Sequence, residues 1–251
     1  MNRLSNKTAL ITGGNSGIGY ATAAAFVKEG AQVIITGRNS DTVQSSAEDL
    51  KVTGIVADQA DLNSIKNLAS EAAAKFGKLD IIFMNAGIAA FAPFETATEK
   101  HFDDIMNINF RGLYFTLQGL LPILNDGGSI IFNTSINANI GMPGSSVYAA
   151  SKGAVLSLAR VLATELAGRQ IRVNSISPGP VTTPLYNTLG MSQDDMAAMG
   201  AMLSNKILLK RFGHVDEVAL AAVFLASADA GFMTGSELII DGGLSVNSVT
   251  N

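Results

Sequence analysis

The sequence predicts one α/β domain built on a doubly wound parallel sheet of about seven strands, with helices on both faces. Short runs of apolar and β-branched residues alternate along the chain with longer segments of helical spacing, and this alternation is typical of parallel βαβ units. The runs are continuously apolar, which favours strands that are covered on both faces. The predicted strands are residues 8–12, 32–36, 55–57, 79–84, 129–133, 171–176 and 237–240.

Helical patterns fill the intervals between these strands. They lie at residues 17–30, 62–76, 99–124, 148–167 and 215–228. No repeat, linker or low-complexity tract divides the chain, so we expect residues 1–251 to form a single domain. Only residues 185–210, which are rich in Met and Ala, depart from the strand–helix rhythm.

The composition excludes several classes of protein. Apolar residues make up 47% of the 251 residues and charged residues 15%, which favours a folded core over disorder. A net charge of -4 makes nucleic acid a poor candidate partner. The absence of cysteine rules out disulfides, thiolate metal sites and cysteine nucleophiles.

No segment has the pattern of a membrane anchor or a signal peptide. The amino-terminal residues 1–7 are polar, and the most apolar stretch of helix length, residues 112–124, is too short to span a bilayer. His101 and His214 have no partners at metal-ligand spacing, so we expect no metal site. The sequence predicts a soluble, cytoplasmic protein.

A glycine-rich segment connects the first predicted strand to the first predicted helix. Gly13, Gly17 and Gly19 allow tight turns and a close approach of the backbone to a pyrophosphate. The helix that follows would present free N–H groups and the positive end of its dipole to the phosphates. The segment therefore predicts a dinucleotide site; the alternative is a glycine-rich turn without a ligand.

Tyr148 and Lys152 are four residues apart at the start of a predicted helix, so both side chains lie on one face. A phenol titrates near pH ~10, and a cation held close lowers its pKa by about 1–3 pH units, which suits proton transfer. Ser135 comes just after a predicted strand, and Asn109 lies in mid-helix, where asparagine is unfavourable. For the Tyr–Lys pair alone, a solvated helix face is the alternative.

Together these motifs resemble the classical short-chain dehydrogenase/reductase family along essentially the whole chain, in the expected order. The likeness is greatest to its 3-oxoacyl-carrier-protein reductases and glucose dehydrogenase-like members, and it implies a Rossmann-type fold. The positions that carry the resemblance are 12–19, 85–87, 109, 135, 148, 152, 178–183, 234–235 and 241–243.

The resemblance implies an oxidoreductase that moves a hydride between a nicotinamide dinucleotide and a ketone or secondary alcohol. Tyr148 would be the general acid/base, and Ser135 would polarise the substrate oxygen. Lys152 would hold the nicotinamide ribose and lower the pKa of Tyr148, and Asn109 would support a water between Lys152 and solvent. Two hydroxyl groups on the substrate oxygen would stabilise the charge that develops there, while the cofactor supplies the hydride chemistry.

The same resemblance assigns the cofactor-binding residues. Asp58 would meet the adenine amino group, with a strand-end turn as the alternative, and Thr183 would hold the carboxamide or phosphate region. The full set is Gly13, Asn15, Ser16, Gly17, Ile18, Gly19, Arg38, Asp58, Gln59, Asn85, Ala86, Gly87, Tyr148, Lys152, Pro178, Gly179, Val181 and Thr183.

The end of the second predicted strand indicates which dinucleotide is preferred. Enzymes that use NAD carry an acid there to bind the ribose 2′-hydroxyl. This chain has Gly37 followed by Arg38, and a guanidinium can grip a 2′-phosphate that a carboxylate would repel. We therefore expect NADP(H) to be preferred, with NAD(H) possible. The alternative is an arginine that stacks on adenine without selecting the cofactor.

In the family, the segment that matches residues 185–210 covers the substrate as a lid. Its methionines suit an apolar, irregular ligand, but they would fit equally well against the core or a neighbouring subunit. We expect an apolar or moderately polar small-molecule ketone or alcohol. A 3-oxoacyl thioester is the alternative substrate, although residues 125–128 lack the basic side chains that an acidic carrier would meet.

A non-catalytic dinucleotide-binding sensor on the same fold is the alternative from a different class. Such a sensor would be free to lose Tyr148, Lys152 or Ser135, and all three are present, which favours the enzyme. A lyase or dehalogenase of the family would lack the glycines or the lysine. The resemblance also implies a homotetramer, without nucleic-acid or membrane partners.

Overall fold

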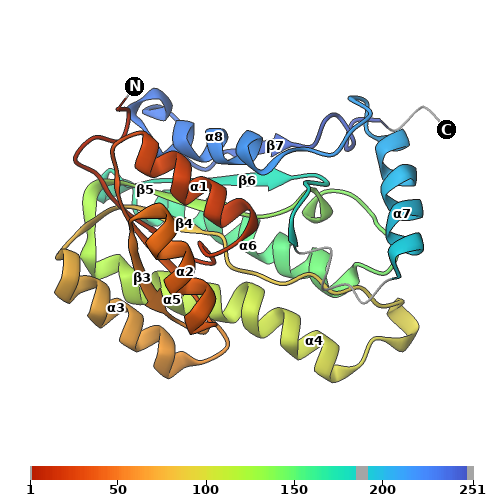
Figure 1. The fold of residues 1–251 in the computed structure, drawn as a ribbon, viewed down its shortest axis with the longest axis horizontal. Coiled ribbons are helices and arrows are strands. Elements are labelled where there is room, and N and C mark those ends of the chain that lie inside the picture. The colour runs from red at the N-terminus through yellow and green to blue at the C-terminus, as the bar shows by residue number, and fades with distance from the viewer. Residues whose placement is uncertain (1, 185–191, 248–251) are drawn as a thin grey trace.

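The computed structural model describes residues 2–184 and 192–247 of the chain. In them, seven strands form one sheet in the order β3-β2-β1-β4-β5-β6-β7 (Figure 1). All neighbouring strands are parallel, which confirms the predicted doubly wound sheet. The strands are β1 (Thr8–Ile11), β2 (Gln32–Gly37), β3 (Thr53–Val56), β4 (Leu79–Met84), β5 (Leu124–Asn133), β6 (Arg172–Pro178) and β7 (Glu237–Ile240).

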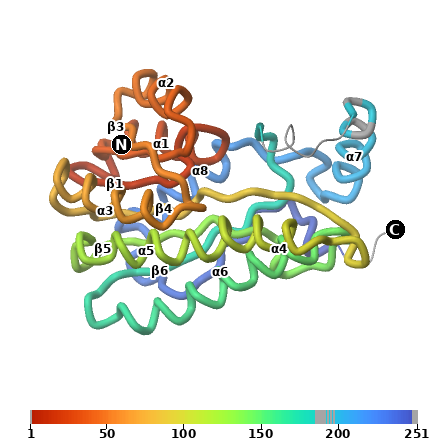
Figure 2. The backbone as a smooth tube through the Cα atoms, turned by 90° about the horizontal axis from the view of Figure 1, so that it is seen from below, coloured from red at the N-terminus to blue at the C-terminus, as the bar shows by residue number. Residues whose placement is uncertain are grey.

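Helices cover both faces of the sheet (Figure 2). Helices α1, α2 and α8 pack apolar side chains on one face, and α3, α5 and α6 pack them on the other. Helix α7 stands apart from both layers, beyond the carboxyl end of the sheet (Figure 1). The helices are α1 (Gly17–Lys28), α2 (Ser40–Leu50), α3 (Leu62–Phe76), α4 (Glu99–Met106), α5 (Leu113–Leu120), α6 (Ser146–Glu165), α7 (Gln193–Lys206) and α8 (Val215–Ala226).

The strand order reverses between β1 and β4, at the centre of the sheet. From β1 the chain proceeds outward to β2 and β3, and from β4 it proceeds the other way to β7. The two central strands pair in register, with Ile11 beside Phe83. In open α/β sheets, ligands bind outside the carboxyl ends of the strands at such a reversal. The glycine loop after β1 and the segment after β4 therefore meet where a dinucleotide is expected.

Helix α2 is absent from the sequence prediction, and two strands begin earlier than predicted. Only Val43 and Ala47 of α2 are buried, so its apolar pattern is weak. The helix also ends at Lys51, in a left-handed conformation with φ of 56°, where glycine is the usual stop signal. Strand β3 starts at residue 53 rather than 55, and β5 at residue 124 rather than 129.

The helix predicted over residues 99–124 is interrupted. Between α4 and α5 the chain makes a π-helical turn at Asn107–Gly112, a rare feature that is frequent at functional sites. Glycine is required at position 112, because a Cβ there would lie only 2.0 Å from the carbonyl oxygen of Gln59 and would clash with it. The close approach presses the helix against the loop that follows β3.

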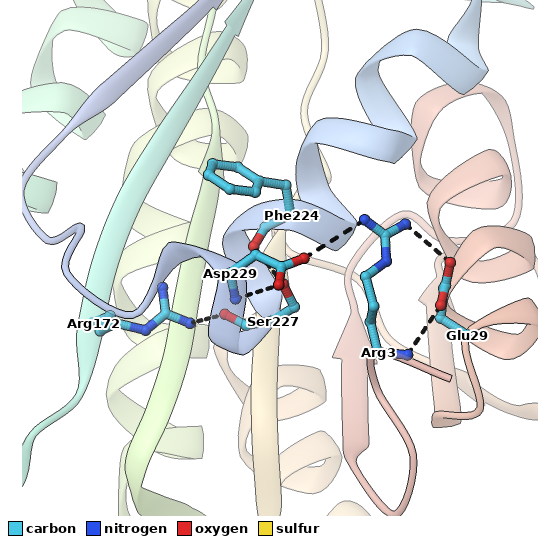
Figure 3. Close-up of polar contacts among 6 residues, drawn as sticks. All are labelled: Arg3, Glu29, Arg172, Phe224, Ser227 and Asp229. Atoms are coloured by element: carbon cyan, nitrogen blue, oxygen red, sulfur yellow. Dashed lines mark hydrogen bonds and ion pairs between the residues drawn. The ribbon is translucent and has the colours of Figure 1, made fainter. Parts of the chain in front are cut away.

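Charged side chains tie the chain together at the amino end of the sheet (Figure 3). The main-chain N–H and the guanidinium of Arg3 both donate to Glu29, at 3.0 and 2.9 Å, and Arg3 forms an ion pair with Asp229 at 3.9 Å. Arg172, at the start of β6, donates to the carbonyl of Ser227 at 3.2 Å. These contacts join the amino terminus to the ends of α1 and α8. They lie at the amino ends of the strands, opposite to the carboxyl ends where a dinucleotide is expected.

Within residues 2–184 and 192–247, no helix combines the length and the apolar character needed to cross a membrane. The same residues bring no three His, Cys, Asp or Glu side chains together in the manner of a metal site.

Candidate active site

The glycine loop makes a tight turn between β1 and α1. Gly13 and Gly17 have positive φ angles of 63° and 52°, which favour glycine. A Cβ on Gly19 would lie 2.1 Å from the carbonyl oxygen of Gly13. Ser16 precedes α1 in an extended conformation, and its side chain makes no capping bond. The N–H groups of the first turn, including that of Ile18, are therefore suited to bind an anion such as a pyrophosphate.

Asn15 links this loop to α2 beside the predicted ribose site. Its Nδ2 donates to Thr42 Oγ1 at 2.9 Å, and its carbonyl accepts from Ser46 Oγ at 3.1 Å. A Cβ on Gly37 would lie 2.5 Å from Asn15 Oδ1, so the side chain of Asn15 fills the space where an acidic residue would begin. Arg38 is exposed at the same point. No hydrogen bond or ion pair joins its side chain to the rest of the described chain.

Polar side chains at the ends of β1, β4 and β5 hold the loop in place. Asn85 Nδ2 donates to the carbonyls of Thr12 and Gly13, at 3.0 and 3.2 Å, and the Thr12 hydroxyl accepts from the N–H groups of Asn85 and Ala86. Asn133 Nδ2 donates to Asn85 Oδ1 at 2.8 Å. The sequence analysis named Asn85 and Ala86 as site residues and included Thr12 in the glycine-rich motif, but it missed Asn133. The only sequence signal of Asn133 is a polar residue at the end of a buried strand.

Helix α6 carries Tyr148 and Lys152 on one face, in contact with the segment after β5. The side chain of Ser135 lies close enough to the Tyr148 phenol to lower its pKa. Lys152 Nζ lies 5.8 Å from the centroid of the Tyr148 ring and donates to the carbonyl of Asn133 at 2.9 Å. Lys152 and Ser135 are only 5% and 8% exposed. The structure thus brings together a phenol, a hydroxyl and an ammonium group.

Burial dominates the electrostatics of this group. It raises the pKa of Tyr148 above its ordinary value, while the nearby Ser135 side chain lowers it by less. Burial also lowers the pKa of Lys152 from 10.5 to about 8. The sequence analysis expected Lys152 to lower the pKa of Tyr148, and the net direction is the opposite, because loss of solvation disfavours the phenolate.

Asn109 lies in the π-helical turn and is 1% exposed. Its Oδ1 accepts from the N–H of Ile88 at 2.8 Å, and its Nδ2 donates to the carbonyl of Ile88 at 2.9 Å and to Ser151 Oγ at 3.1 Å. A Cβ on the neighbouring Gly87 would lie 3.1 Å from Asn109 Oδ1 and 3.5 Å from Lys152 Nζ. Asn109 therefore joins the loop after β4 to α6, beside the lysine.

The loop after β3 contains two further predicted site residues. Asp58 accepts from the N–H of Ala60 at 2.9 Å through Oδ1, which is the turn geometry named as its alternative role. The amide of Gln59 is buried, and neither of its polar atoms has a partner among the described residues. The predicted contact of Asp58 with adenine stays a prediction.

The chain after β6 returns to the glycine loop. Pro178 ends β6, and a Cβ on Gly179 would lie 2.7 Å from that of Asp241. Val181 forms a bridge to Gly213. A Cβ on Gly17 would lie 3.6 Å from the Cβ of Thr183, so Thr183 lies beside the start of α1. Its predicted contact with the cofactor stays a prediction.

Phe91 is a neighbour of Tyr148 that sequence reasoning missed. The two rings meet edge to face, with centroids 6.0 Å apart and planes at 74°. Phe91 is 41% exposed, so one side of its ring remains open beside the phenol. Ala92 holds this segment in place by donating to the carbonyl of Gly144 at 2.9 Å. The sequence could not predict this contact, because nothing in the loop around Phe91 indicates that its ring lies beside Tyr148.

The predicted lid is described only in part. Residues 185–191, which include Leu185, Tyr186 and Met191, lie outside the described residues. The remainder forms α7 and the turn after it. Met202, on α7, is 53% exposed.

Comparisons with known proteins identify the family. Residues 13–245 match the family described as Enoyl-(Acyl carrier protein) reductase. The chain is 38% identical to the 3-oxoacyl-[acyl-carrier-protein] reductase FabG of Thermotoga maritima, over 96% of this chain and 99% of that protein. It is 37% identical to the glucose 1-dehydrogenase of Gluconobacter oxydans, over 97% and 94%.

A solved structure gives the same result. A short-chain type dehydrogenase/reductase from Mycobacterium marinum superposes with a TM-score of 0.87 at 34% identity, covering 96% of each chain. The chain belongs to the classical short-chain dehydrogenase/reductase family, as an oxidoreductase that acts on alcohols and ketones with a nicotinamide cofactor.

Proposed function

We propose that this protein is an NADP(H)-dependent ketone reductase or secondary-alcohol dehydrogenase in which Tyr148 is the general acid/base. The observation that carries the proposal is the meeting of Tyr148, Ser135 and Lys152 beside the glycine loop, at the reversal of strand order. Two neighbouring hydroxyls suit an oxygen that gains negative charge.

In the reducing direction, the residues divide the work as follows. Ser135 donates a hydrogen bond to the substrate oxygen and fixes its orientation. Tyr148 donates its proton to the same oxygen as negative charge develops there. The raised pKa of Tyr148 keeps it protonated, and therefore ready to donate, at neutral pH. A bound nicotinamide dinucleotide supplies the hydride.

The residues at the crevice fit such a dinucleotide. Gly13 and Gly19 let the loop fold tightly on itself, since a Cβ on Gly19 would collide with the carbonyl of Gly13, and this turn brings the backbone N–H groups to the start of α1. The first turn of α1 carries no acidic side chain that would repel phosphate. We propose that the ribose hydroxyls are held by Lys152 and Tyr148, and the outer phosphates by the glycine loop and Thr183.

Arg38 supports NADP(H) over NAD(H). Its exposed guanidinium has no competing partner among the described residues, and Asn15 occupies the position beside Gly37 from which a carboxylate would reach the ribose. A 2′-phosphate would find the Arg38 guanidinium there, and no carboxylate at the position of Gly37.

Phe91 supports an apolar or aromatic substituent on the substrate. Its half-exposed ring stands beside the proposed proton donor, where it offers a flat apolar surface. We propose that residues 185–210 close over this side as a lid, within a single domain of residues 1–251.

A 3-oxoacyl thioester on a carrier protein is less well supported, although one relative bears that name. Residues 125–128, where an acidic carrier would need basic side chains, have Arg169 and Arg172 as their nearest arginines. Arg169 is paired with Asp126 at 2.7 Å, and both lie at the amino edge of the sheet, away from Ser135. Neither is free to attract an acidic carrier at the crevice.

We propose a homotetramer that works in the cytoplasm, where nicotinamide dinucleotides are available. Exposed apolar side chains on α8 and beyond support contact with further copies of the chain: Leu220 is 57% exposed and Phe232 is fully exposed.

The deciding experiment follows NADPH and NADH absorbance with a panel of aryl and aliphatic ketones, β-keto esters, sugars and acyl thioesters. Turnover of simple ketones with NADPH is the expected result. Cofactor binding without turnover of any compound would instead favour the non-catalytic sensor.

A further inference from the structure

Glu237 lies on the edge strand β7, outside every motif of the family resemblance, yet it is connected to the segment that carries Ser135. Its Oε1 accepts from Ser177 Oγ and from Asn139 Nδ2, both at 2.5 Å. One carboxylate oxygen of β7 thus binds both β6 and the turn that follows β5.

The Ser177 branch leads through buried groups to the residue before Ser135. Ser177 and Thr134 are 0% and 3% exposed, and their hydroxyl oxygens lie 2.5 Å apart. The N–H of Thr134 donates to the carbonyl of Ile176 at 2.8 Å. Because Ser177 gives its one hydroxyl proton to Glu237, Thr134 Oγ1 is the donor in its contact with Ser177, and the carbonyl of Ile176 at 2.7 Å is the alternative acceptor for the same proton. Hydrogen bonds in such low-dielectric surroundings are strong, and they hold geometry tightly.

The Asn139 branch reaches the other end of the same segment. Ser135 begins a short 3-10 helix at Ile136–Ala138, and its Oγ accepts from the N–H of Asn137 at 3.2 Å. Asn139 closes this turn by donating from its N–H to Ile136 at 2.8 Å. Glu237 therefore holds residues 134 and 139, on either side of Ser135.

We propose that Glu237 is a positioning residue that fixes Ser135 in line with the Tyr148 hydroxyl; this rests on the proposed function. No hydrogen bond or ion pair among the described residues joins Glu237 to Tyr148 or Ser135, so it acts through Thr134 and Asn139. The acceptor oxygen is the essential feature, because both branches end on Oε1.

Three variants test the proposal with NADPH and whichever ketone of the panel is turned over fastest. Glu237→Met removes the acceptor at similar size and should lower kcat by roughly ten-fold or more, since misplacement of a reacting group is costly. The KM for NADPH should stay within about two-fold. Glu237→Gln keeps an acceptor oxygen and should recover most of the loss. Glu71→Met removes an exposed carboxylate of α3 and is the matched control.

A double-mutant cycle with Ser135→Ala separates positioning from general damage. If Glu237 acts through Ser135, Glu237→Met should change kcat by less than about two-fold in the Ser135→Ala background. An equal fold loss in both backgrounds would overturn the proposal, as would a Glu237→Gln variant as poor as Glu237→Met.

A readout that needs no turnover covers the case in which the proposed function fails. Amide hydrogen exchange of residues 134–140 should accelerate in Glu237→Met and in the milder Ser177→Ala, with β1 and β4 unchanged. Unchanged exchange in this segment would overturn the positioning role. Absence of turnover in the parent protein would overturn only the proposed reaction.

Discussion

The ammonium group of Lys152 donates to the main-chain carbonyl of Asn133 at 2.9 Å, and the side chain of Asn133 donates to Asn85 at 2.8 Å. Asn85 in turn holds the carbonyls of Thr12 and Gly13. One chain of hydrogen bonds therefore runs from the proposed catalytic helix, across β5 and β4, to the glycine loop. Displacement of the end of β4 or β5 would therefore shift both the glycine loop and Lys152.

Replacing Lys152 by Met should stabilise the protein at neutral pH while abolishing turnover. The pKa of Lys152 falls from 10.5 to about 8 on burial, so the folded state carries a penalty for the buried charge of at most about 3 kcal/mol. Below pH 8 the lysine is charged in both states and the penalty is complete. It declines between about pH 8 and 10.5, where the unfolded chain binds more protons, and stability rises with pH.

The measurement is the thermal midpoint of Lys152→Met against the parent at several pH values. We expect Tm to rise by a few degrees at pH 7 and the difference to shrink towards pH 10. Lys66→Met, at an exposed position on α3, is the control and should have no such dependence. A loss of Tm that is the same at every pH would contradict the assignment.

Tyr148→Phe should retain cofactor binding and lose most turnover. The substitution removes only the hydroxyl, so the ring contact with Phe91 remains, but the proton donor is gone. General acid–base groups contribute typically about 10²–10⁴-fold. Stopped-flow NADPH oxidation and fluorescence titration of NADPH separate the two effects. A variant that reduces ketones at nearly the parent rate would remove Tyr148 from the mechanism.

Much of the fold follows from local pattern, because buried parallel strands are continuously apolar. The seven predicted strands all exist, and Gly37 at the end of β2 is correctly placed beside the glycine loop. Helix α2 escapes prediction, since only Val43 and Ala47 anchor it. The break in the helix over residues 99–124 is also invisible, because a π-helical turn depends on the contact of Gly112 with a distant loop.

The candidate site divides in the same way. Tyr148, Lys152 and Ser135 carry a recognisable spacing, and the fold brings them together. Asn133 and Phe91 take part through contacts with residues far away in the sequence, which spacing cannot reveal. The pKa of Tyr148 depends on burial, so its direction could not be read from the nearby lysine alone.

Arg38→Gln should shift the cofactor preference from NADPH towards NADH. Loss of a charged hydrogen bond to phosphate costs about 1.5–3 kcal/mol, so the KM for NADPH should rise roughly ten- to a hundred-fold. The KM for NADH should change little. Steady-state kinetics with both cofactors measure the effect. If preference is unaltered, Arg38 only stacks on the adenine.

The double variant Gly37→Asp, Arg38→Gln tests the same point from the side of NAD(H). Because a Cβ on Gly37 would lie 2.5 Å from Asn15 Oδ1, the new carboxylate requires Asn15 to turn away from Thr42. Adding Asn15→Ala should therefore improve NADH use by this variant. No improvement would mean that Asn15 does not obstruct the position.

Asn109→Ala should weaken both stability and turnover. The substitution removes three buried hydrogen bonds, two to Ile88 and one to Ser151, and leaves the N–H and the carbonyl of Ile88 without these partners. We expect a loss of about 2–4 kcal/mol in unfolding free energy. Asn109→Asp should not restore it, because a carboxylate oxygen would face the Ile88 carbonyl. Urea titration measures the loss, and exposed Asn63→Ala is the control.

Phe91→Leu should reduce the preference for aryl over aliphatic ketones. The Phe91 ring is edge-on to Tyr148 and 41% exposed, so an aryl substituent on a carbonyl held by Tyr148 can stack against its open side. Aromatic pairs contribute about 0.5–1.5 kcal/mol beyond apolar contact, which predicts a fall of roughly two- to ten-fold in the ratio of kcat/KM for acetophenone to that for 2-octanone. Phe94 is 84% exposed in the same loop, so Phe94→Leu should leave the ratio unchanged. Equal effects of the two substitutions would indicate general loosening of the loop rather than contact with the substrate.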